Sequence, residues 1–156
     1  MNTSAGEPLR VLIVEDGDEY LDNLTRYVQG PVYSQAHNLA DAVRHLQDAV
    51  VDVVYLDMRF DRIPEEQLVG DREDALRRHH GDRERAVRHL QTHQGLYILK
   101  ALADAGFGEM PTVLAYDFRR ELARFKRLKE RYPRLEWVAD TVSADEIHAL
   151  LASLAS

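Results

Sequence analysis

Carboxylates at the ends of apolar segments are the residues of this sequence best suited to chemistry. Glu15 and Asp16 directly follow the apolar run 11–14, and Asp57 follows a second apolar block, 50–56. Neighbouring carboxylates repel one another, and a hard cation such as Mg²⁺ relieves that repulsion by binding their oxygens. A carboxylate beside such an ion can also attack phosphorus and form an aspartyl phosphate. The alternative is that these acids lie in solvated loops at strand ends.

Apolar blocks alternate with helical patterns along the chain, and this order predicts where the acids lie. Apolar segments predict five strands, at 9–14, 31–35, 50–56, 112–116 and 135–139. Apolar residues at helical spacing predict helices at 18–29, 39–49, 95–105, 118–132 and 143–154. Strands without a polar face, each followed by a helix, indicate an α/β fold with a doubly wound, five-stranded parallel sheet. Because the carboxyl ends of such strands share one edge, we expect Glu15, Asp16 and Asp57 to meet there.

Residues 60–94 interrupt this alternation with a stretch rich in acids and arginine. Helical patterns over 71–80 and 82–94 predict a helical insertion after the third strand, running into the helix near Gly95. An insertion at a functional edge serves as a lid, a dimer element or a partner surface, or it is a tolerated surface excursion. His89 and His93 lie four residues apart and suit a transition metal, but solvated histidines are the simpler interpretation.

Composition restricts the class of protein. The chain has 156 residues, 45% hydrophobic and 30% charged, which suits a single globular domain spanning 1–156 with the 60–94 insertion inside it. A net charge of −7 disfavours nucleic acid as a partner, and the absence of cysteine excludes disulfides and thiol catalysis. The N-terminus lacks signal-peptide features and no apolar run could cross a membrane, so we expect a cytoplasmic protein without membrane contact.

Enzymatic alternatives find less support in the sequence. Phosphatases with an aspartate nucleophile need a second acid two residues later, where this chain has Arg59. The turn 15–18, EDGD, has no glycine-rich loop for a nucleotide phosphate. No Ser-His-Asp arrangement is suggested by the order of residues. We therefore expect that the protein is not an enzyme.

The order and spacing of these motifs resemble those of response-regulator receiver domains from two-component systems. The segment 11–16, VLIVED, is similar to the opening of that family, and 52–58, DVVYLDM, is similar to its phosphoacceptor strand. The segments 95–99 and 143–147 are similar to its third and last helices. The resemblance covers the chain from about Leu9 to Leu154 except the insertion, and it implies the (βα)5 flavodoxin-like receiver fold.

This resemblance implies a function in phosphorelay signal transduction. Asp57 would accept a phosphoryl group from a histidine kinase or a phosphotransfer protein. Glu15, Asp16, Asp57 and the backbone carbonyl of Arg59 would bind Mg²⁺. An output protein that the sequence does not identify would respond, and a homodimer would form through the 118–134 helix or the 60–94 insertion.

Two positions depart from the family. The fourth strand ends in 114–117, LAYD, without the usual Ser or Thr, and Asp140 and Thr141 stand where the family has Lys-Pro. Asp140 adds an acid where phosphoryl oxygens need positive charge. Arg59 either folds back to supply that charge or faces solvent. Two functions therefore stay open: a phosphorylated receiver, and a degenerate pseudo-receiver that acts as a phosphorylation-independent protein–protein interaction module.

The helix predicted at 118–132 is strongly basic. A solvated helix face explains its charge most simply. An acidic partner surface is the alternative, which agrees with a role in output contacts or dimerisation.

Overall fold

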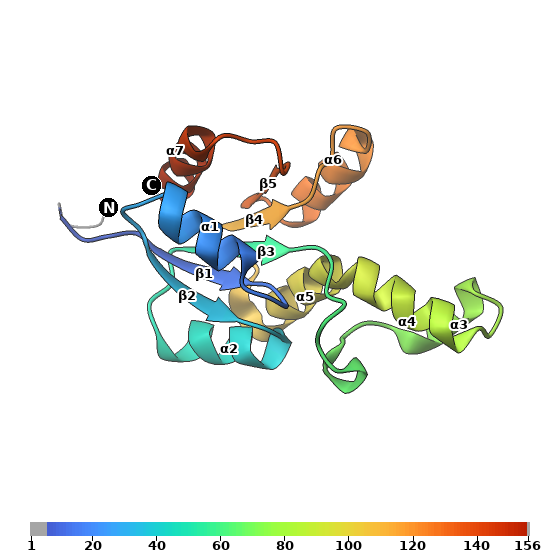
Figure 1. Ribbon diagram of the computed structural model, residues 1–156. Coiled ribbons are helices and arrows are strands. Elements are labelled where there is room, and N and C mark those ends of the chain that lie inside the picture. Colours follow the sequence, from blue (N-terminus) through green and yellow to red (C-terminus); the bar gives the residue numbers. More distant parts are fainter. Residues whose placement is uncertain (1–5, 156) are drawn as a thin grey trace.

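A five-stranded parallel sheet forms the centre of the computed structural model, which describes residues 6–155 (Figure 1). The strands are β1 (Arg10–Val14), β2 (Val32–Ala36), β3 (Val53–Asp57), β4 (Thr112–Ala115) and β5 (Leu135–Val138). Their order in the sheet is β2-β1-β3-β4-β5, so the predicted doubly wound α/β fold is confirmed. Residues 1–5, part of the N-terminus compared above with signal peptides, lie outside the described range.

Helices cover both faces of this sheet (Figure 1). On one face lie α1 (Glu19–Tyr27) and α7 (Ala144–Ala155). On the other lie α2 (Leu39–Asp48), α5 (Gln94–Leu102) and α6 (Leu122–Arg131). The strand side chains alternate between the two layers: Val11 and Ile13 pack with the α1 and α7 core, whereas Leu12 and Val14 pack with the opposite core. Burial on both faces explains why the inner strands β1, β3 and β4 are mostly apolar, whereas the edge strand β2 carries polar residues.

Side-chain caps mark the starts of two helices. The Asn38 side chain accepts a hydrogen bond from the Asp41 N–H at the start of α2. The Ser143 hydroxyl accepts from the Glu146 N–H in the first turn of α7. Each cap satisfies a backbone donor that has no partner within its helix, and so defines where the helix begins.

The basic helix is shorter than predicted: α6 is Leu122–Arg131 instead of 118–132. Phe118 is fully buried, and its ring packs 5.3 Å from Phe125 and 6.0 Å from Trp137, measured between ring centroids. This burial draws the chain into a turn before the helix, in which the Glu121 N–H bonds to the Phe118 carbonyl. The helix near Gly95 also differs, because α5 passes at Leu102 into a π-helical turn, η2 (Ala103–Phe107).

The segment 60–94 forms an arm that extends beyond the carboxyl edge of the sheet (Figure 1). It contains a 3₁₀ turn, η1 (Glu65–Gln67), and the helices α3 (Arg72–Arg78) and α4 (Arg83–Thr92), and α4 leads through His93 into α5. Gln94 anchors the arm: its buried amide accepts from the Val69 N–H at 2.8 Å and donates to the Val69 carbonyl at 2.9 Å. The predicted helical character of this segment is confirmed.

Candidate functional site

The three candidate acids meet at the carboxyl edge of the sheet. Glu15 and Asp16 directly follow β1, and Asp57 is the last residue of β3. These strands are neighbours, with Val14 opposite Leu56 in the register. The chain runs outward in opposite directions from β1 and β3, so the acids lie at the topological switch point of the sheet.

Glu15 is buried and its carboxylate serves helix α1. It accepts the N–H groups of Tyr20 at 3.0 Å and Leu21 at 2.9 Å, and Gln35 Nε2 donates to it at 3.1 Å. Burial raises the pKa of Glu15, and these hydrogen bonds oppose the rise. Both carboxylate oxygens are thus already occupied by protein donors.

Asp16 is bound by the first residues of the arm. Its side chain is 2% exposed, and its Oδ2 accepts the N–H groups of Asp61 at 2.9 Å and Arg62 at 3.0 Å. The Arg62 guanidinium lies 3.3 Å from Asp16 Oδ1 and makes a two-pronged contact with Glu19, at 2.9 and 2.8 Å. This contact lowers the pKa of Glu19 to about 2. The guanidinium is therefore held between two carboxylates.

Gly17 makes this contact sterically feasible. A Cβ at position 17 would lie 2.5 Å from Arg62 Nη2 and 2.5 Å from Glu19 Oε1. Those distances are shorter than any real contact of a methyl carbon, so a side chain at this position would displace the guanidinium.

The hypothesis that Arg59 supplies the missing positive charge is wrong. Its guanidinium pairs with Asp61 at 3.0 Å, and its side chain is 64% exposed. Arg62, three residues further on, makes the contact with the acids, and sequence reasoning missed it. The signal that could have found it is a second arginine close after the third strand, in the segment that must leave the sheet across the acidic edge.

Asp57 is half-buried beside the other two acids. Burial, together with the charges of Asp16 and Glu15, raises the pKa of its carboxyl to about 7, and the hydrogen bond from the Met58 N–H at 2.8 Å opposes this rise. A carboxyl with this pKa is partly protonated at neutral pH. Its state thus depends on how the surrounding negative charge is compensated.

The ends of β4 and β5 bring neither an aliphatic hydroxyl nor a cation to Asp57. Ala115, the last residue of β4, is opposite Asp57 in the register. The hydroxyl of the next residue, Tyr116, donates to Glu121, and its ring packs against Phe118 at 4.7 Å. Beyond β5, Asp140 is exposed to solvent.

The acids as arranged do not fit a magnesium ion. Mg²⁺ requires near-octahedral oxygen ligands and retains several waters. The Glu15 oxygens are engaged by α1 and Gln35, and Asp16 is engaged by Arg62 and two backbone N–H groups. Within residues 6–155, no group of three or more acids or histidines has a metal-binding arrangement. Magnesium at Glu15, Asp16, Asp57 and the Arg59 carbonyl stays a prediction.

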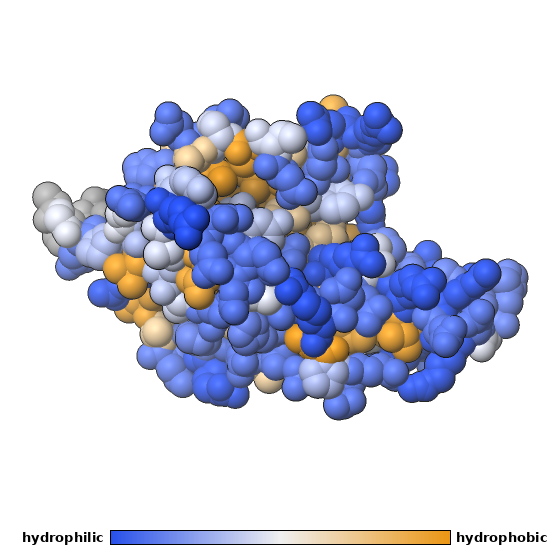
Figure 2. Space-filling model, in the orientation of Figure 1, coloured by the Kyte–Doolittle hydropathy of each residue, from blue (hydrophilic) through white to orange (hydrophobic). Residues whose placement is uncertain are grey.

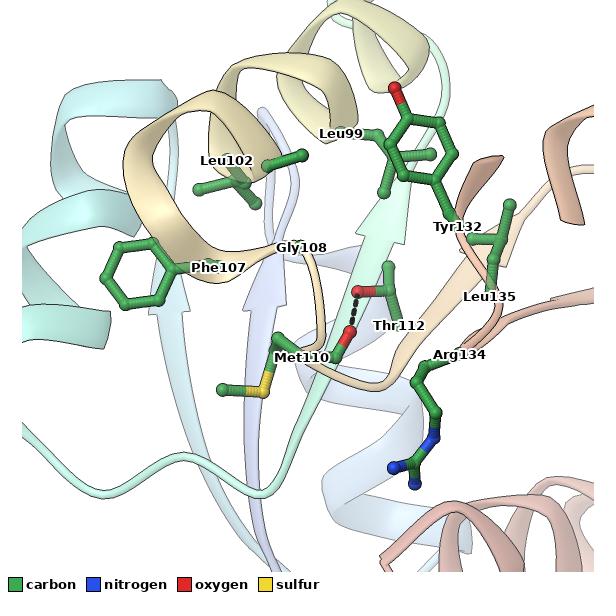
Figure 3. A pocket seen from close by; sticks show the side chains of 10 residues that line it. Leu99, Leu102, Phe107, Gly108, Met110, Thr112, Tyr132, Arg134 and Leu135 are labelled. Carbon is green, nitrogen blue, oxygen red and sulfur yellow. Dashed lines mark hydrogen bonds between the residues drawn. The ribbon is translucent and has the colours of Figure 1, made fainter. Parts of the chain in front are cut away.

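Two cavities differ in what they could hold. A hollow of about 640 Å³ lies between α1, the ends of β4 and β5, and α7, and is lined by Tyr20, Tyr55 and Asp140 among apolar residues. Apolar surface is visible between α7 and α6, above α1 (Figure 2). The second cavity, between α5 and β4, has about 10 Å³, room for one water, and the Thr112 hydroxyl donates to the Met110 carbonyl beside it (Figure 3). Of these two, the first is large enough for a ligand or a partner side chain.

Three histidines of the arm stack instead of converging on a metal. The ring centroids of His79 and His89 are 5.5 Å apart, and those of His89 and His93 are 4.4 Å apart. Burial lowers the pKa of His89, and the neighbouring His93 and His79 lower it further. Nδ1 of His93 is in hydrogen-bond contact with the His89 carbonyl at 2.9 Å. This arrangement favours the simpler interpretation, partly solvated histidines.

The basic helix keeps part of its charge free. Arg124 pairs with Glu121 and Lys129 pairs with Glu136. Within the described residues no ion pair involves Lys126, Arg127 or Arg131 of α6, or Arg120 in the turn before it. None of the helix residues is fully buried. A partner with acidic groups would find four cations available here.

Comparisons with known proteins give structural matches alone. No protein-family profile and no curated protein sequence matches the chain. The receiver domain of the Francisella response regulator 1452 is 14% identical with a TM-score of 0.62, and the match covers 96% of this chain and 97% of that one. The receiver domain of NtrX from Brucella abortus is 15% identical with a TM-score of 0.61, and the match covers 93% of this chain and 97% of that one. The chemotaxis response regulator CheY4 of Vibrio cholerae is 12% identical with a TM-score of 0.59, and the match covers 95% of this chain and 99% of that one.

Within residues 6–155, no helix is both long enough and apolar enough to cross a bilayer.

Proposed function

Because the chain has the fold of response-regulator receiver domains, we propose that it is a signal-transduction module acting through protein contacts without phosphoryl transfer. It is then a pseudo-receiver: not an enzyme, located in the cytoplasm and bound to a protein partner. The observation that carries the proposal is the chemistry around Asp57. Acids surround this carboxyl, and β4 and β5 end in Ala115 and Val138, without the hydroxyl and the cation that a phosphoryl group needs.

Electrostatics explains why this matters. A phosphoryl group on Asp57 would bring close to two negative charges next to Asp16 and Glu15. Stabilising that charge requires donors or cations aimed at the phosphoryl oxygens. Asp140 beyond β5 is negative, and the Tyr116 hydroxyl is engaged by Glu121. The remaining nearby cation, Arg62, is held by Asp16 and Glu19.

A second candidate function is phosphorylation of Asp57 with Mg²⁺, by a histidine kinase or a phosphotransfer protein. The observation in its favour is the position of Asp57, half-buried at the end of β3 with two acids beside it. A divalent cation would favour the ionised form of these acids, and the carboxyl would then be nucleophilic. This function requires Arg62 to leave Asp16.

The two functions differ in a mass measurement. The purified protein is incubated with Mg²⁺ and a small phosphodonor, beside Asp57→Ala, and intact masses are recorded. A receiver domain of established phosphoacceptor activity, treated in parallel, controls for the donor. We expect no gain of mass in this protein. A gain of one phosphoryl group, about 80 Da, that is absent from Asp57→Ala would overturn the proposal and support the second candidate.

The partner surface has one candidate with a defined chemistry. The free cations of α6 and the absence of a buried residue in that helix fit an acidic protein surface. An output protein, or a homodimer through α6 or the arm, stays a prediction.

A further inference from the structure

We propose that Arg62 is a built-in cation, whose guanidinium at Asp16 replaces a divalent metal ion and ties the arm to the sheet. The inference deepens the proposed function, since it explains how the acids are stabilised without a metal ion. It concerns the cation at the acids, whereas phosphoryl transfer concerns Asp57, so the two can fail separately.

The first step is that Arg62 and its neighbour Asp61 together contact both oxygens of Asp16. The guanidinium faces three carboxylate oxygens, Asp16 Oδ1 at 3.3 Å and the two oxygens of Glu19 at 2.8 and 2.9 Å. The other Asp16 oxygen accepts two backbone N–H groups from the same segment, those of Asp61 and Arg62. Both oxygens of Asp16 are therefore contacted by one short stretch of chain, and its side chain is 2% exposed although that of Arg62 is 52% exposed.

The second step is that the surroundings are shaped for this contact. Gly17 leaves the space that the guanidinium fills, because a Cβ there would lie 2.5 Å from Nη2 and 2.6 Å from Cζ of Arg62. Glu19, in the first turn of α1, contributes the two-pronged partner that a planar guanidinium prefers. A hydrated metal ion at Asp16 would have to displace these groups.

The third step links the contact to the arm. Phe60 is fully buried, and its N–H donates to the Gln91 carbonyl of α4 at 2.9 Å. Two residues later, Arg62 is fixed to Asp16 at the end of β1 and to Glu19 on α1. The start of the arm is thus fastened on both sides of the acidic edge, and the cation that replaces the metal is also the tether.

The test measures Mg²⁺ binding by isothermal titration calorimetry in four proteins: wild type, Arg62→Ala, Arg62→Lys and Arg59→Ala. Arg59 is the matched control because it is a neighbouring, exposed arginine that pairs only with Asp61 among the described residues. Circular dichroism checks that each variant is folded, and Arg62→Gln replaces the alanine variant if that one is not. Hydrogen exchange of segment 58–64 is measured on the same four proteins.

We expect Arg62→Ala to bind Mg²⁺ at least about tenfold more tightly than wild type, since removal of a positive charge frees Asp16 for the ion. Arg62→Lys should fall between them because a lysine ammonium is a point charge without the two-pronged contact. Arg59→Ala should match wild type. Exchange in 58–64 should rise in Arg62→Ala alone.

Two results would overturn the inference. One is equal Mg²⁺ affinity in wild type and folded Arg62→Ala, whether both bind or neither does. The other is unchanged hydrogen exchange of segment 58–64 in Arg62→Ala. Phosphorylation of wild-type Asp57 would instead overturn the proposed function while leaving these affinities as the measure of Arg62.

Discussion

At the scale of single residues, charge compensation decides what the acidic edge can do. The Glu15 carboxylate accepts hydrogen bonds from the N–H groups of α1, and the Asp16 carboxylate accepts them from the segment that follows β3. Asp57 is left with a backbone N–H donor and no cation among its strongest electrostatic neighbours. The three carboxylates at the carboxyl edge of the sheet thus have three different environments, which residue type alone does not predict.

A pH-dependent stability follows from Asp57. Its folded-state pKa of about 7 lies above the ordinary value of 3.8, so between these pH values the folded protein holds a proton that the unfolded chain releases. This contribution to stability is present below pH 4 and is lost as the pH rises through 7. Asp57→Asn lacks this contribution, so the stability of the variant relative to wild type should increase between pH 5 and pH 8, by at most about 3 kcal/mol.

Urea unfolding at the two pH values measures this difference. The exposed acid Asp104, which pairs with Lys100, provides the control variant Asp104→Asn. Its free energy of unfolding relative to wild type should change little between pH 5 and pH 8. If the free energy of unfolding of Asp57→Asn relative to wild type is the same at pH 5 and pH 8, the Asp57 carboxyl is ionised at both pH values and the prediction is wrong.

The sequence predicted the identities of the acids but not their partners. Apolar runs placed Glu15, Asp16 and Asp57 at strand ends, because strand patterns are local. The Arg62 contact spans more than 40 residues of sequence and depends on the path of the arm, which no local pattern encodes. Sequence reasoning therefore considered only Arg59, which lies nearer to Asp57 in sequence, and of its two alternatives the structure shows the exposed one.

At the scale of elements, the close approach of α5 to β3 fixes the geometry below the site. Gly95 donates its N–H to the Met58 carbonyl at 2.8 Å, at the start of α5. A Cβ on Gly95 would lie 2.5 Å from the Asp57 carbonyl oxygen and 2.8 Å from the Met58 Cα. Since these are backbone atoms, the helix itself would have to move away from the strand.

Gly95→Ala should therefore destabilise the protein by about 1–3 kcal/mol, the usual cost of overpacking. Gly108→Ala is the matched control, because its Cβ would meet Ala103 at an ordinary 3.6 Å, and it should change the stability by less than about 0.5 kcal/mol. Chemical denaturation of both variants measures the effect. Equal free energies of unfolding for Gly95→Ala and Gly108→Ala would mean that α5 can move away from β3 without cost.

The elements themselves were largely predictable. Continuous apolar segments identified β1, β3 and β4, and weaker patterns placed β2 and β5. The start of α6 was placed too early because Phe118 fits the helical spacing, although its burial beside Trp137 requires a turn. The π-helical turn after Leu102 has no sequence signature of this kind.

At the scale of the whole molecule, the arm is joined to the sheet by few fixed points. Its helices α3 and α4 pack mainly on each other. Beyond the Arg62 tether the arm is held by the buried Gln94 amide, by the hydrogen bond from Asn38 to Gln67, and by buried apolar residues such as Phe60 and Leu90. Such a unit can open without unfolding the sheet.

Gln94→Leu should increase hydrogen exchange across 65–92 and leave β1 and β3 unchanged. Leucine has a similar volume but leaves the Val69 N–H and carbonyl without their partner. Gln47→Leu, at an exposed position on α2, serves as the control and should leave the arm unchanged. An equal rise in exchange in the arm and the sheet would mean that they unfold as one unit.

The central claim is that the protein's own groups, and not a metal ion with a phosphoryl group, stabilise the acidic edge. A titration followed by ¹H–¹⁵N correlation spectra tests it most directly, with Mg²⁺ added first and then beryllofluoride, which mimics a phosphoryl group on a carboxylate. We predict that the amide signals of Glu15, Asp16 and 57–62 stay in place through both additions. Saturable shifts of these signals that disappear in Asp57→Ala would contradict the claim.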